Sequence, residues 1–239
     1  MRLSKRIYAL ANAVNDGDTV ADIGTDHGYV PMLLIRQKKS PRVIMSDISA
    51  DSLAKARETF ALCMLEDQVS EEDFRVGDGL DTLDYGETDE LIIAGLGGHT
   101  IRSILEEDEE KSRSFGRLVL QPRKHSGTLR YYLYTHGWDI ESEQLAEEGK
   151  FACEIITAVP SDSRLREAPY PEDDIRWKYP ERLLEADPLL VRKRVEWKAG
   201  SVREQIENMR SAGTDSSGII LQLEKDAAYL DALLSRANK

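Results

Sequence analysis

The stretch ADIGTDHGYVP, residues 21–31, decides the fold. The residues up to Ile23 are typical of the end of a buried strand, and Gly24 begins a turn in which a ligand can approach the backbone closely. Nucleotide-binding turns of this kind usually have another small residue where this chain has Asp26. A helix is expected from Tyr29 onward. The stretch therefore predicts the strand, turn and helix that open an α/β domain.

Strand-like and helix-like segments alternate through the first 160 residues. The expected strands are 19–22, 42–47, 74–77, 91–94 and 117–121, and the expected helices are 3–14, 29–37, 50–65, 99–107 and 127–136. This alternation predicts a mostly parallel sheet with helices on both faces. Two further strands, 138–146 and 151–159, are joined by a turn at 147–150, which predicts an antiparallel hairpin at one end of the sheet.

The pattern changes after Val159, where five prolines punctuate an acidic linker. Two helical segments follow, with a turn expected at 213–218. Apolar residues in the second segment are spaced three and four apart, as in a coiled coil: Ile220, Leu223, Ala227, Leu230 and Leu234. We predict a domain at 1–160 and, at 161–239, a linker with an antiparallel helical hairpin. The same seam could serve dimerisation, so a monomer or a weak dimer is expected.

The composition is typical of a soluble α/β protein, with 41% hydrophobic and 32% charged residues. No apolar run approaches the roughly 18 residues that a membrane span needs, and the first residues lack the pattern of a signal peptide. Cys63 and Cys153 are the only cysteines, and with four histidines they show no zinc-site spacing. We expect a cytoplasmic protein with no metal and no membrane partner.

The net charge of −12 is unevenly distributed. Residues 160–239 carry 14 Lys and Arg against 15 Asp and Glu, so nearly all of the excess lies before them. The total charge disfavours a nucleic-acid partner, but binding to phosphates depends on local basic clusters. Three such clusters are Arg2 with Lys5 and Arg6, residues 123–130, and residues 192–203. For the third, a solvated helix face is the favoured interpretation.

Four segments lie at expected carboxyl ends of strands, where a doubly wound sheet binds its ligand. They are the turn 22–28, Asp47 with Ile48, Asp78 with Gly79, and the turn 94–98. Each is a weak indication alone, because an aspartate after a strand is also a common helix N-cap, as Asp47 would be for the next helix. Together, at successive strand ends, they indicate one ligand site.

The carboxylates in these turns indicate the charge of the ligand. A dinucleotide places its pyrophosphate at the helix N-terminus, where Asp22 and Asp26 would repel it. S-adenosylmethionine carries a sulfonium and an ammonium, which nearby carboxylates favour. Asp47 suits the ribose hydroxyls and Asp78 an adenine amino group. We therefore favour S-adenosylmethionine as the cofactor, and an NAD-linked enzyme is disfavoured, since no hydride-transfer His or Tyr-Lys pair is evident.

With these residues in view, the chain resembles the bacterial tRNA (adenine(22)-N1)-methyltransferase family. The resemblance rests on residues 21–31, on IAGLGG at 93–98, and on LQP at 120–122 followed by Leu129 and Arg130. It implies a class I methyltransferase fold, S-adenosylmethionine as donor, and methylation of N1 of an adenine in the D-arm region of tRNA. Fold, turns and resemblance together give these predicted cofactor-binding residues: Asp22, Gly24, Asp26, His27, Gly28, Asp47, Ile48, Asp78, Gly79 and Gly95.

The implied reaction needs alignment more than acid–base chemistry, because adenine N1 has a free lone pair at neutral pH. The predicted catalytic residues are Asp26, Gly95 and Gly97, which would stabilise the positive charge that develops on the adenine. Capping of the next helix is the alternative role for Asp26. N1 lies on the Watson–Crick edge, so the base must leave its stack. The predicted substrate contacts are Arg6, Tyr29, His99, Arg123, Lys124 and Arg130.

Two other functions stay open on the residues alone. A small-molecule methyltransferase would share the cofactor site, but a helical extension suits a large partner better than the lid such enzymes carry. A catalytically silent RNA-binding or protein-binding module would keep the fold, yet the cofactor residues are intact. tRNA is therefore the favoured partner.

Overall fold

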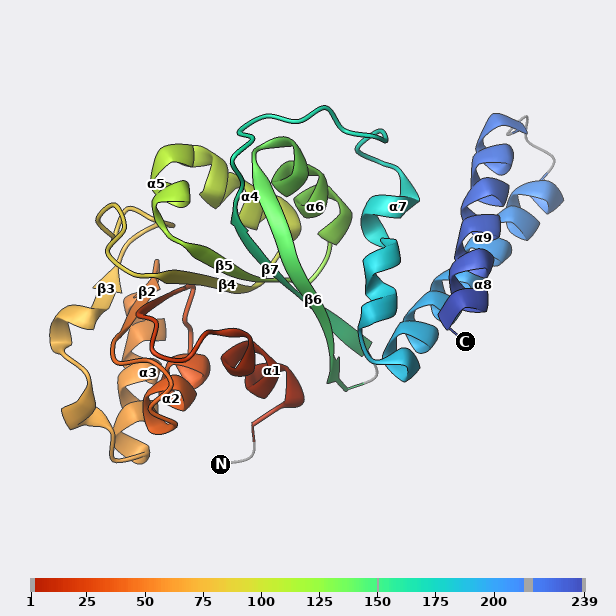
Figure 1. Cartoon of the computed structure of the whole chain (residues 1–239). Coiled ribbons are helices and arrows are strands. Elements are labelled where there is room, and N and C mark those ends of the chain that lie inside the picture. The colour runs from red at the N-terminus through yellow and green to blue at the C-terminus, as the bar shows by residue number, and fades with distance from the viewer. Residues whose placement is uncertain (1–2, 150, 213–216, 238–239) are drawn as a thin grey trace.

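The computed structural model describes residues 3–149, 151–212 and 217–237. Its centre is a seven-stranded sheet in the order β3-β2-β1-β4-β5-β7-β6 (Figure 1). The strands are β1 (Val20–Ile23), β2 (Val43–Asp47), β3 (Phe74–Val76), β4 (Glu90–Leu96), β5 (Arg117–Pro122), β6 (Trp138–Glu148) and β7 (Phe151–Pro160). In the described sheet, β7 pairs antiparallel with β5 and β6, and the other pairs are parallel. The predicted fold class is confirmed.

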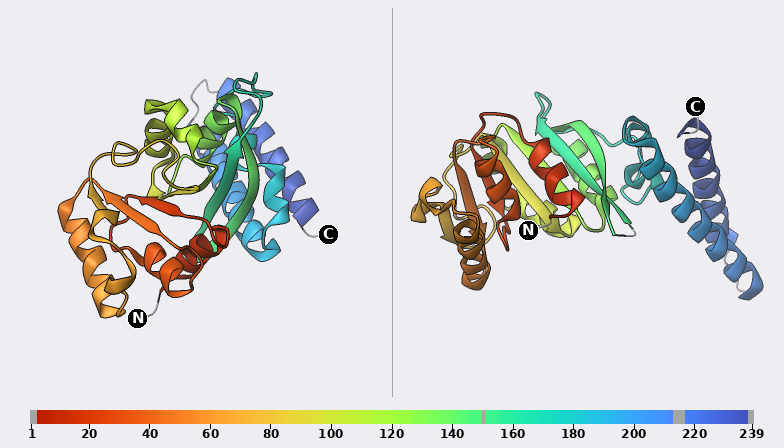
Figure 2. Two further views of the ribbon diagram at one scale, coloured as in Figure 1. Left: turned by 60° about the vertical axis from the view of Figure 1, so that its left-hand side comes forward. Right: turned by 90° about the horizontal axis from the view of Figure 1, so that it is seen from below.

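Helices cover both faces of the sheet, as the alternating pattern predicts (Figure 2). Before the linker they are α1 (Lys5–Ala13), α2 (Tyr29–Arg36), α3 (Ala50–Leu62), α4 (Gly98–Glu107), α5 (Glu109–Ser114) and α6 (Ser126–Thr135). After β7 come α7 (Ile175–Lys178), α8 (Pro188–Ala212) and α9 (Ser217–Ala237). The sequence pattern did not reveal α5 and α7, because they are too short to show a helical repeat of apolar residues.

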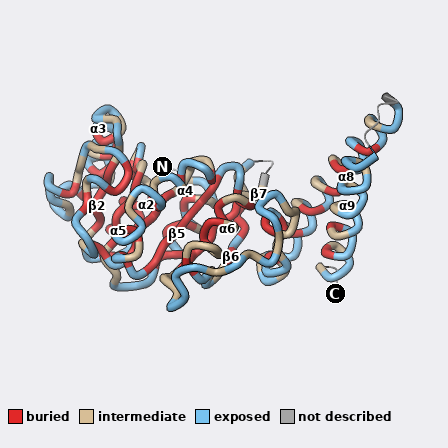
Figure 3. Tube along the Cα trace, turned by 90° about the horizontal axis from the view of Figure 1, so that it is seen from above, coloured by how far each residue is buried: buried red, intermediate tan, exposed pale blue. Residues whose placement is uncertain are grey.

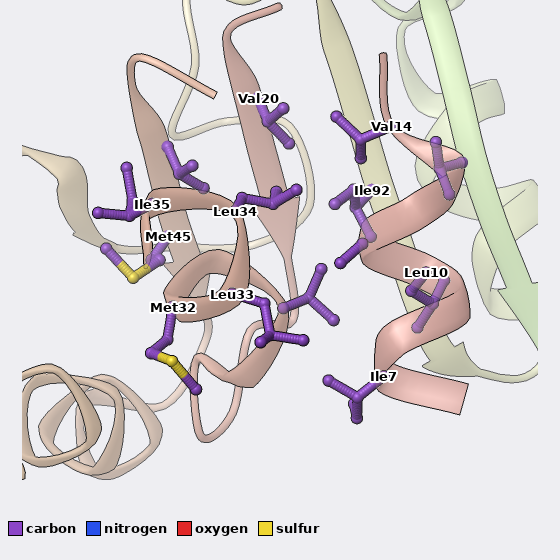
Figure 4. Close-up of a cluster of buried hydrophobic side chains, with 14 of the residues drawn as sticks. Ile7, Leu10, Val14, Val20, Met32, Leu33, Leu34, Ile35, Met45 and Ile92 are labelled. Carbon is purple, nitrogen blue, oxygen red and sulfur yellow. The ribbon is translucent and has the colours of Figure 1, made fainter. Parts of the chain in front are cut away.

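Each face of the sheet has its own apolar core, since successive side chains of a strand point to opposite faces. Val119 of β5 packs with α1, α2 and α3, whereas Leu118 and Leu120 pack with α4 and α6. Figure 4 shows the first of these cores, in which Leu10 of α1 and Leu33 of α2 lie against the strands. Both helices begin close to the carboxyl edge of the sheet, so this core also positions the site described below.

The helices α8 and α9 pack along each other beyond β6, as the spacing of their apolar residues predicts (Figure 3). Val195 and Val202 of α8 are buried with Leu230 and Leu233 of α9. The turn expected at 213–218 lies largely outside the described residues. Leu145 of β6 joins the same apolar cluster, so the hairpin is packed against the sheet domain. The division of the chain near residue 160 stays a prediction.

A buried ion-pair network fastens α8 to the sheet. Arg130 of α6 donates to Glu143 at 2.6 Å, and Arg130 and Arg194 both pair with Glu154 of β7. The side chain of Arg130 is 2% exposed, so the prediction that it contacts RNA is wrong. Its partners come from distant strands and could not be recognised in the local sequence. Burial lowers the pKa of the Arg194 guanidinium to about 10.

The described residues include no helix that is both long and apolar enough to cross a membrane. Among them there is also no cluster of His, Cys, Asp and Glu side chains suited to a metal ion. Cys63 and Cys153 are free thiols.

Replacing Glu154 by leucine tests the network. The substitution removes the shared partner of two largely buried guanidinium groups, so we expect Glu154→Leu to lower the free energy of unfolding by about 3–5 kcal/mol. Urea denaturation followed by circular dichroism measures it. The control is Glu196→Leu, which breaks the exposed pair with Arg192 and should cost less than about 1 kcal/mol. Equal losses in the two variants would contradict the role of the network.

Candidate active site

A cavity of about 510 Å³ lies at the carboxyl ends of β1, β2 and β4, under the start of α1. The strand order reverses on either side of β1, which pairs with both β2 and β4, so the turns diverge here and leave a crevice. The cavity is lined by nine of the ten predicted cofactor-binding residues: Asp22, Gly24, Asp26, His27, Asp47, Ile48, Asp78, Gly79 and Gly95. The tenth, Gly28, stands behind the wall, where a Cβ would lie 3.0 Å from Ala56.

The turn after β1 is fixed by backbone hydrogen bonds to β2. The N–H groups of Gly24 and Thr25 donate to the carbonyl of Ser46 at 2.8 and 3.0 Å. Gly24 has φ +75°, a conformation that favours glycine. The Thr25 hydroxyl donates to the buried Asp22 carboxyl at 2.8 Å. Burial nevertheless dominates and raises the pKa of Asp22 to about 6, so a cation bound beside it would stabilise the ionised form.

Asp47 joins two of the turns. One carboxylate oxygen accepts the N–H of Asp26 at 3.1 Å, and the other accepts the N–H of Ser49 at 2.9 Å. The N-cap of α3 is Ser49, so the alternative role of Asp47 as that cap is wrong. Each oxygen of Asp47 keeps a free lone pair, which suits the two hydroxyls of a ribose.

Asp26 and His27 form the exposed rim of the cavity. Asp26 pairs with Lys55 at 3.2 Å and does not cap α2, because the N-cap is Gly28 and no side chain bonds to it. The alternative role of Asp26 is therefore wrong, and its catalytic role stays a prediction. His27 stacks on Tyr29 with ring centroids 5.1 Å apart, and both residues line the cavity.

The turns after β4 and β5 are joined by their backbones. Arg123 N–H donates to the carbonyl of Leu96 and Gly98 N–H to that of Lys124, both at 2.8 Å. Gly95 lines the cavity with φ +80°, whereas Gly97 is not part of its wall. The prediction that Gly97 acts on the substrate therefore lacks a geometric basis in this structure.

The basic residues lie on the side of the cavity next to β5. Arg6 and Arg123 line it together with Tyr29. Arg123 and Lys124 also line a neighbouring groove of about 700 Å³ that reaches α8. His99 is exposed and lines neither of the two, with its ring 4.4 Å from that of His125. The structure thus brings Arg6, Tyr29 and Arg123 to the cavity and leaves His99 outside.

Sequence reasoning missed several residues of the site. Thr25 and Ser46 hold the turn after β1, and Gln121 of β5 is buried beside Arg6, whose guanidinium donates to its amide oxygen at 3.3 Å. Of these three residues, only Gln121 could have been noticed in the sequence, since it lies in the LQP segment that supports the resemblance. No role followed from that segment alone.

The donor set fits S-adenosylmethionine. Four carboxylates from three turns, Asp22, Asp26, Asp47 and Asp78, surround the cavity and favour a cation over a pyrophosphate. The opposite side carries Arg6 and Arg123, which suit an anionic partner arriving from outside. Chemically, the cavity is suited to hold a cationic nucleoside next to a polyanion.

The strand order, the single antiparallel β7 and the acidic turns define a class I methyltransferase. The model of the methyltransferase domain family matches residues 3–156. A tRNA (adenine(22)-N(1))-methyltransferase of Bacillus subtilis is 33% identical over 170 residues, which are 71% of this chain and 69% of that protein. The chain therefore belongs to the family of tRNA (adenine(22)-N1)-methyltransferases.

Solved structures share the fold over nearly the whole chain. TrmK, an M1A22 tRNA methyltransferase of B. subtilis, has a TM-score of 0.74 and 24% identity, covering 99% of this chain and 97% of that one. The TrmK of M. capricolum, solved with S-adenosyl-homocysteine, has a TM-score of 0.76 and 19% identity, covering 99% and 100%. A Listeria monocytogenes protein has a TM-score of 0.84 and 25% identity, covering 98% and 100%.

Gly98→Ala tests the joined turns. A Cβ at Gly98 would lie 2.2 Å from the backbone oxygen of His125, so the turns after β4 and β5 must separate. We expect a loss of about 1–3 kcal/mol in the free energy of unfolding, together with loss of methyl transfer. Gly200→Ala in α8 is the control, since its Cβ meets nothing within 4 Å and alanine favours a helix. A fully active and stable Gly98→Ala variant would refute this account of the turns.

The titration of Asp22 gives the cofactor affinity a pH dependence. Since the pKa of Asp22 is raised to about 6, its carboxyl must lose a proton before it can hold a cation. The affinity for S-adenosylmethionine should rise between about pH 5 and pH 7 and then level off. Below the pKa of Asp22 the rise should be up to about tenfold per pH unit. Calorimetric titration measures this. Asp22→Asn should bind more weakly, without this pH dependence. An unchanged slope in the variant would assign the titration to another group.

Proposed function

We propose that this chain transfers the methyl group of S-adenosylmethionine to N1 of the adenine at position 22 of tRNA. The observation that carries the proposal is the acidic cavity at the switch point of the sheet, with Arg6 and Arg123 beside it. Membership of the family supports the substrate.

Three of the four acidic groups would hold the cofactor. Asp22 would hold the ammonium of the methionine end, Asp47 the ribose hydroxyls, and Asp78 the adenine amino group. Ile48 lines the cavity and would give the adenine of the cofactor an apolar contact. The cofactor supplies an activated methyl group on a sulfonium. The protein's part is to hold that group in line with the incoming nitrogen.

The target adenine enters next to the turn after β4. Its N1 would bond to the methyl carbon with its own lone pair while the bond from that carbon to sulfur breaks and leaves its electron pair on the sulfur, so the chain needs no general base. The product base is cationic, and the Asp26 carboxylate with the carbonyls near Gly95 would stabilise the positive charge as it forms. Tyr29, stacked on His27, gives a flipped base a flat surface at the mouth.

The phosphates of the tRNA would contact the basic residues near the cavity. Arg6, Arg123 and Lys124 lie on this side of the sheet. In α8, by contrast, Arg192 and Arg203 pair with Glu196 and Asp231 of the hairpin itself. Those pairs support the interpretation of Arg192 and Arg203 as part of a solvated face, whereas Arg194 of the same cluster belongs to the buried ion-pair network.

We also propose that the protein is a monomer and lies in the cytoplasm. The apolar seam of α9 packs against α8 of the same chain, so it is not free to bind a second copy, which supports a monomer. Two free thiols suit a reducing compartment.

Methyl transfer to RNA tests the proposal. Purified protein is incubated with labelled S-adenosylmethionine and unmodified tRNAs that carry adenine or guanine at position 22, and the labelled nucleoside is identified after digestion. We expect N1-methyladenosine only with the adenine-bearing tRNAs. Absence of label from both, under conditions where the cofactor binds, would overturn the tRNA proposal.

A further inference from the structure

Gln121 is placed at the meeting point of the cofactor cavity and the neighbouring groove. It is the residue before the last of β5, and its Cα is paired in the sheet with that of Ala94, which lines the cavity. Gln121 itself lines the groove, and Arg123 lines both spaces. Only 1% of Gln121 is exposed. The side chain is therefore buried where the groove and the cavity adjoin, beside the residue that lines both.

The orientation of the Gln121 amide follows from its neighbour. Arg6 donates to the Oε1 atom at 3.3 Å, and since a guanidinium has only donors, the oxygen must face Arg6. The Nε2 atom then points away from Arg6. It is buried and has no hydrogen-bond partner among the described residues. Buried donors without a partner are rare in native proteins, so Nε2 is a donor for which the described residues supply no acceptor.

The chemistry of a glutamine amide matches one edge of adenine. The Hoogsteen edge offers the N6 amino group as donor and N7 as acceptor, and glutamine binds both at once. Oε1 has a second lone pair beside the one that Arg6 uses, and Nε2 is free to donate. Binding of this edge leaves N1 without a partner on the other side of the amino group, so it stays available to the methyl group.

Resting on the function proposed above, we propose that Gln121 recognises the target adenine through N6 and N7 and so determines the specificity of the enzyme. Guanine would place its O6 acceptor against Oε1, which repels it. Pyrimidines have no N7. The same contact both selects adenine and turns its N1 toward the cofactor, with Arg6 holding the amide in place.

Replacement of one substrate atom tests the contact. A tRNA with 7-deazaadenosine at position 22 lacks the N7 acceptor and keeps N1 and N6. We expect the wild-type enzyme to lose about ten- to a hundredfold in kcat/KM on this tRNA relative to adenosine. Gln121→Leu should lose a similar factor on adenosine and lose little more on 7-deazaadenosine. The ratio of kcat/KM of Gln121→Leu on the two tRNAs also measures any effect of the deaza substitution that does not depend on Gln121.

A second variant is needed in case Gln121→Leu disturbs the turn after β5. Gln121→Glu has a similar shape but presents no donor when ionised, so it should favour 7-deazaadenosine relative to the wild-type enzyme. Gln144→Leu on β6 is the control at an exposed glutamine and should keep the wild-type ratio. Calorimetric titration with S-adenosylmethionine checks that each variant retains the cofactor site.

The outcomes separate this inference from the proposed function. Equal rates of the wild-type enzyme on both tRNAs, or the same ratio in Gln121→Leu as in wild type, would overturn the role of Gln121 and leave the methyl transfer intact. No transfer by the wild-type enzyme to any tRNA, with the cofactor bound, would overturn the function and this inference with it.

Discussion

The site depends on the bonds that tie the turn after β1 to the end of β2. The Ser46 carbonyl and the Asp47 carboxylate accept backbone N–H groups from three successive residues of that turn, Gly24, Thr25 and Asp26. These bonds hold Asp22, Asp26 and Asp47 around one cavity, although like charges repel. The concentrated negative charge selects a cationic ligand, and the fold supplies the crevice at its switch point.

The site extends across the sheet through β5. The turns after β4 and β5 share two backbone hydrogen bonds, so the residues that would meet the base are fixed relative to the cofactor turns. Glu154 of β7 then links α6 and α8 through Arg130 and Arg194. The hairpin is thereby attached to the same edge of the domain that carries Arg123 and Lys124. An RNA bound there would contact a sheet domain and a helical hairpin that are held together by these ion pairs.

The local sequence predicted the sheet, its antiparallel end and the pairing of α8 with α9. It could do so because the order of strand-like and helix-like segments and the spacing of apolar residues indicate which face of each element is buried. It also predicted the acidic turns, which are contiguous in sequence. It failed where a role depends on distant partners. Arg130 looks like an exposed basic residue until Glu143 and Glu154 enclose it. The helix caps that were the alternative roles of Asp26 and Asp47 belong to Gly28 and Ser49.

The central claim is that carboxylates at the switch point select a cationic nucleoside. The most direct measurement is a calorimetric titration of the purified protein with S-adenosylmethionine and, separately, with NAD, at pH 7.5 and equal concentrations. The account predicts saturable binding of S-adenosylmethionine at one site per chain and no binding of NAD. Binding of NAD with comparable affinity, or no binding of S-adenosylmethionine, would contradict it.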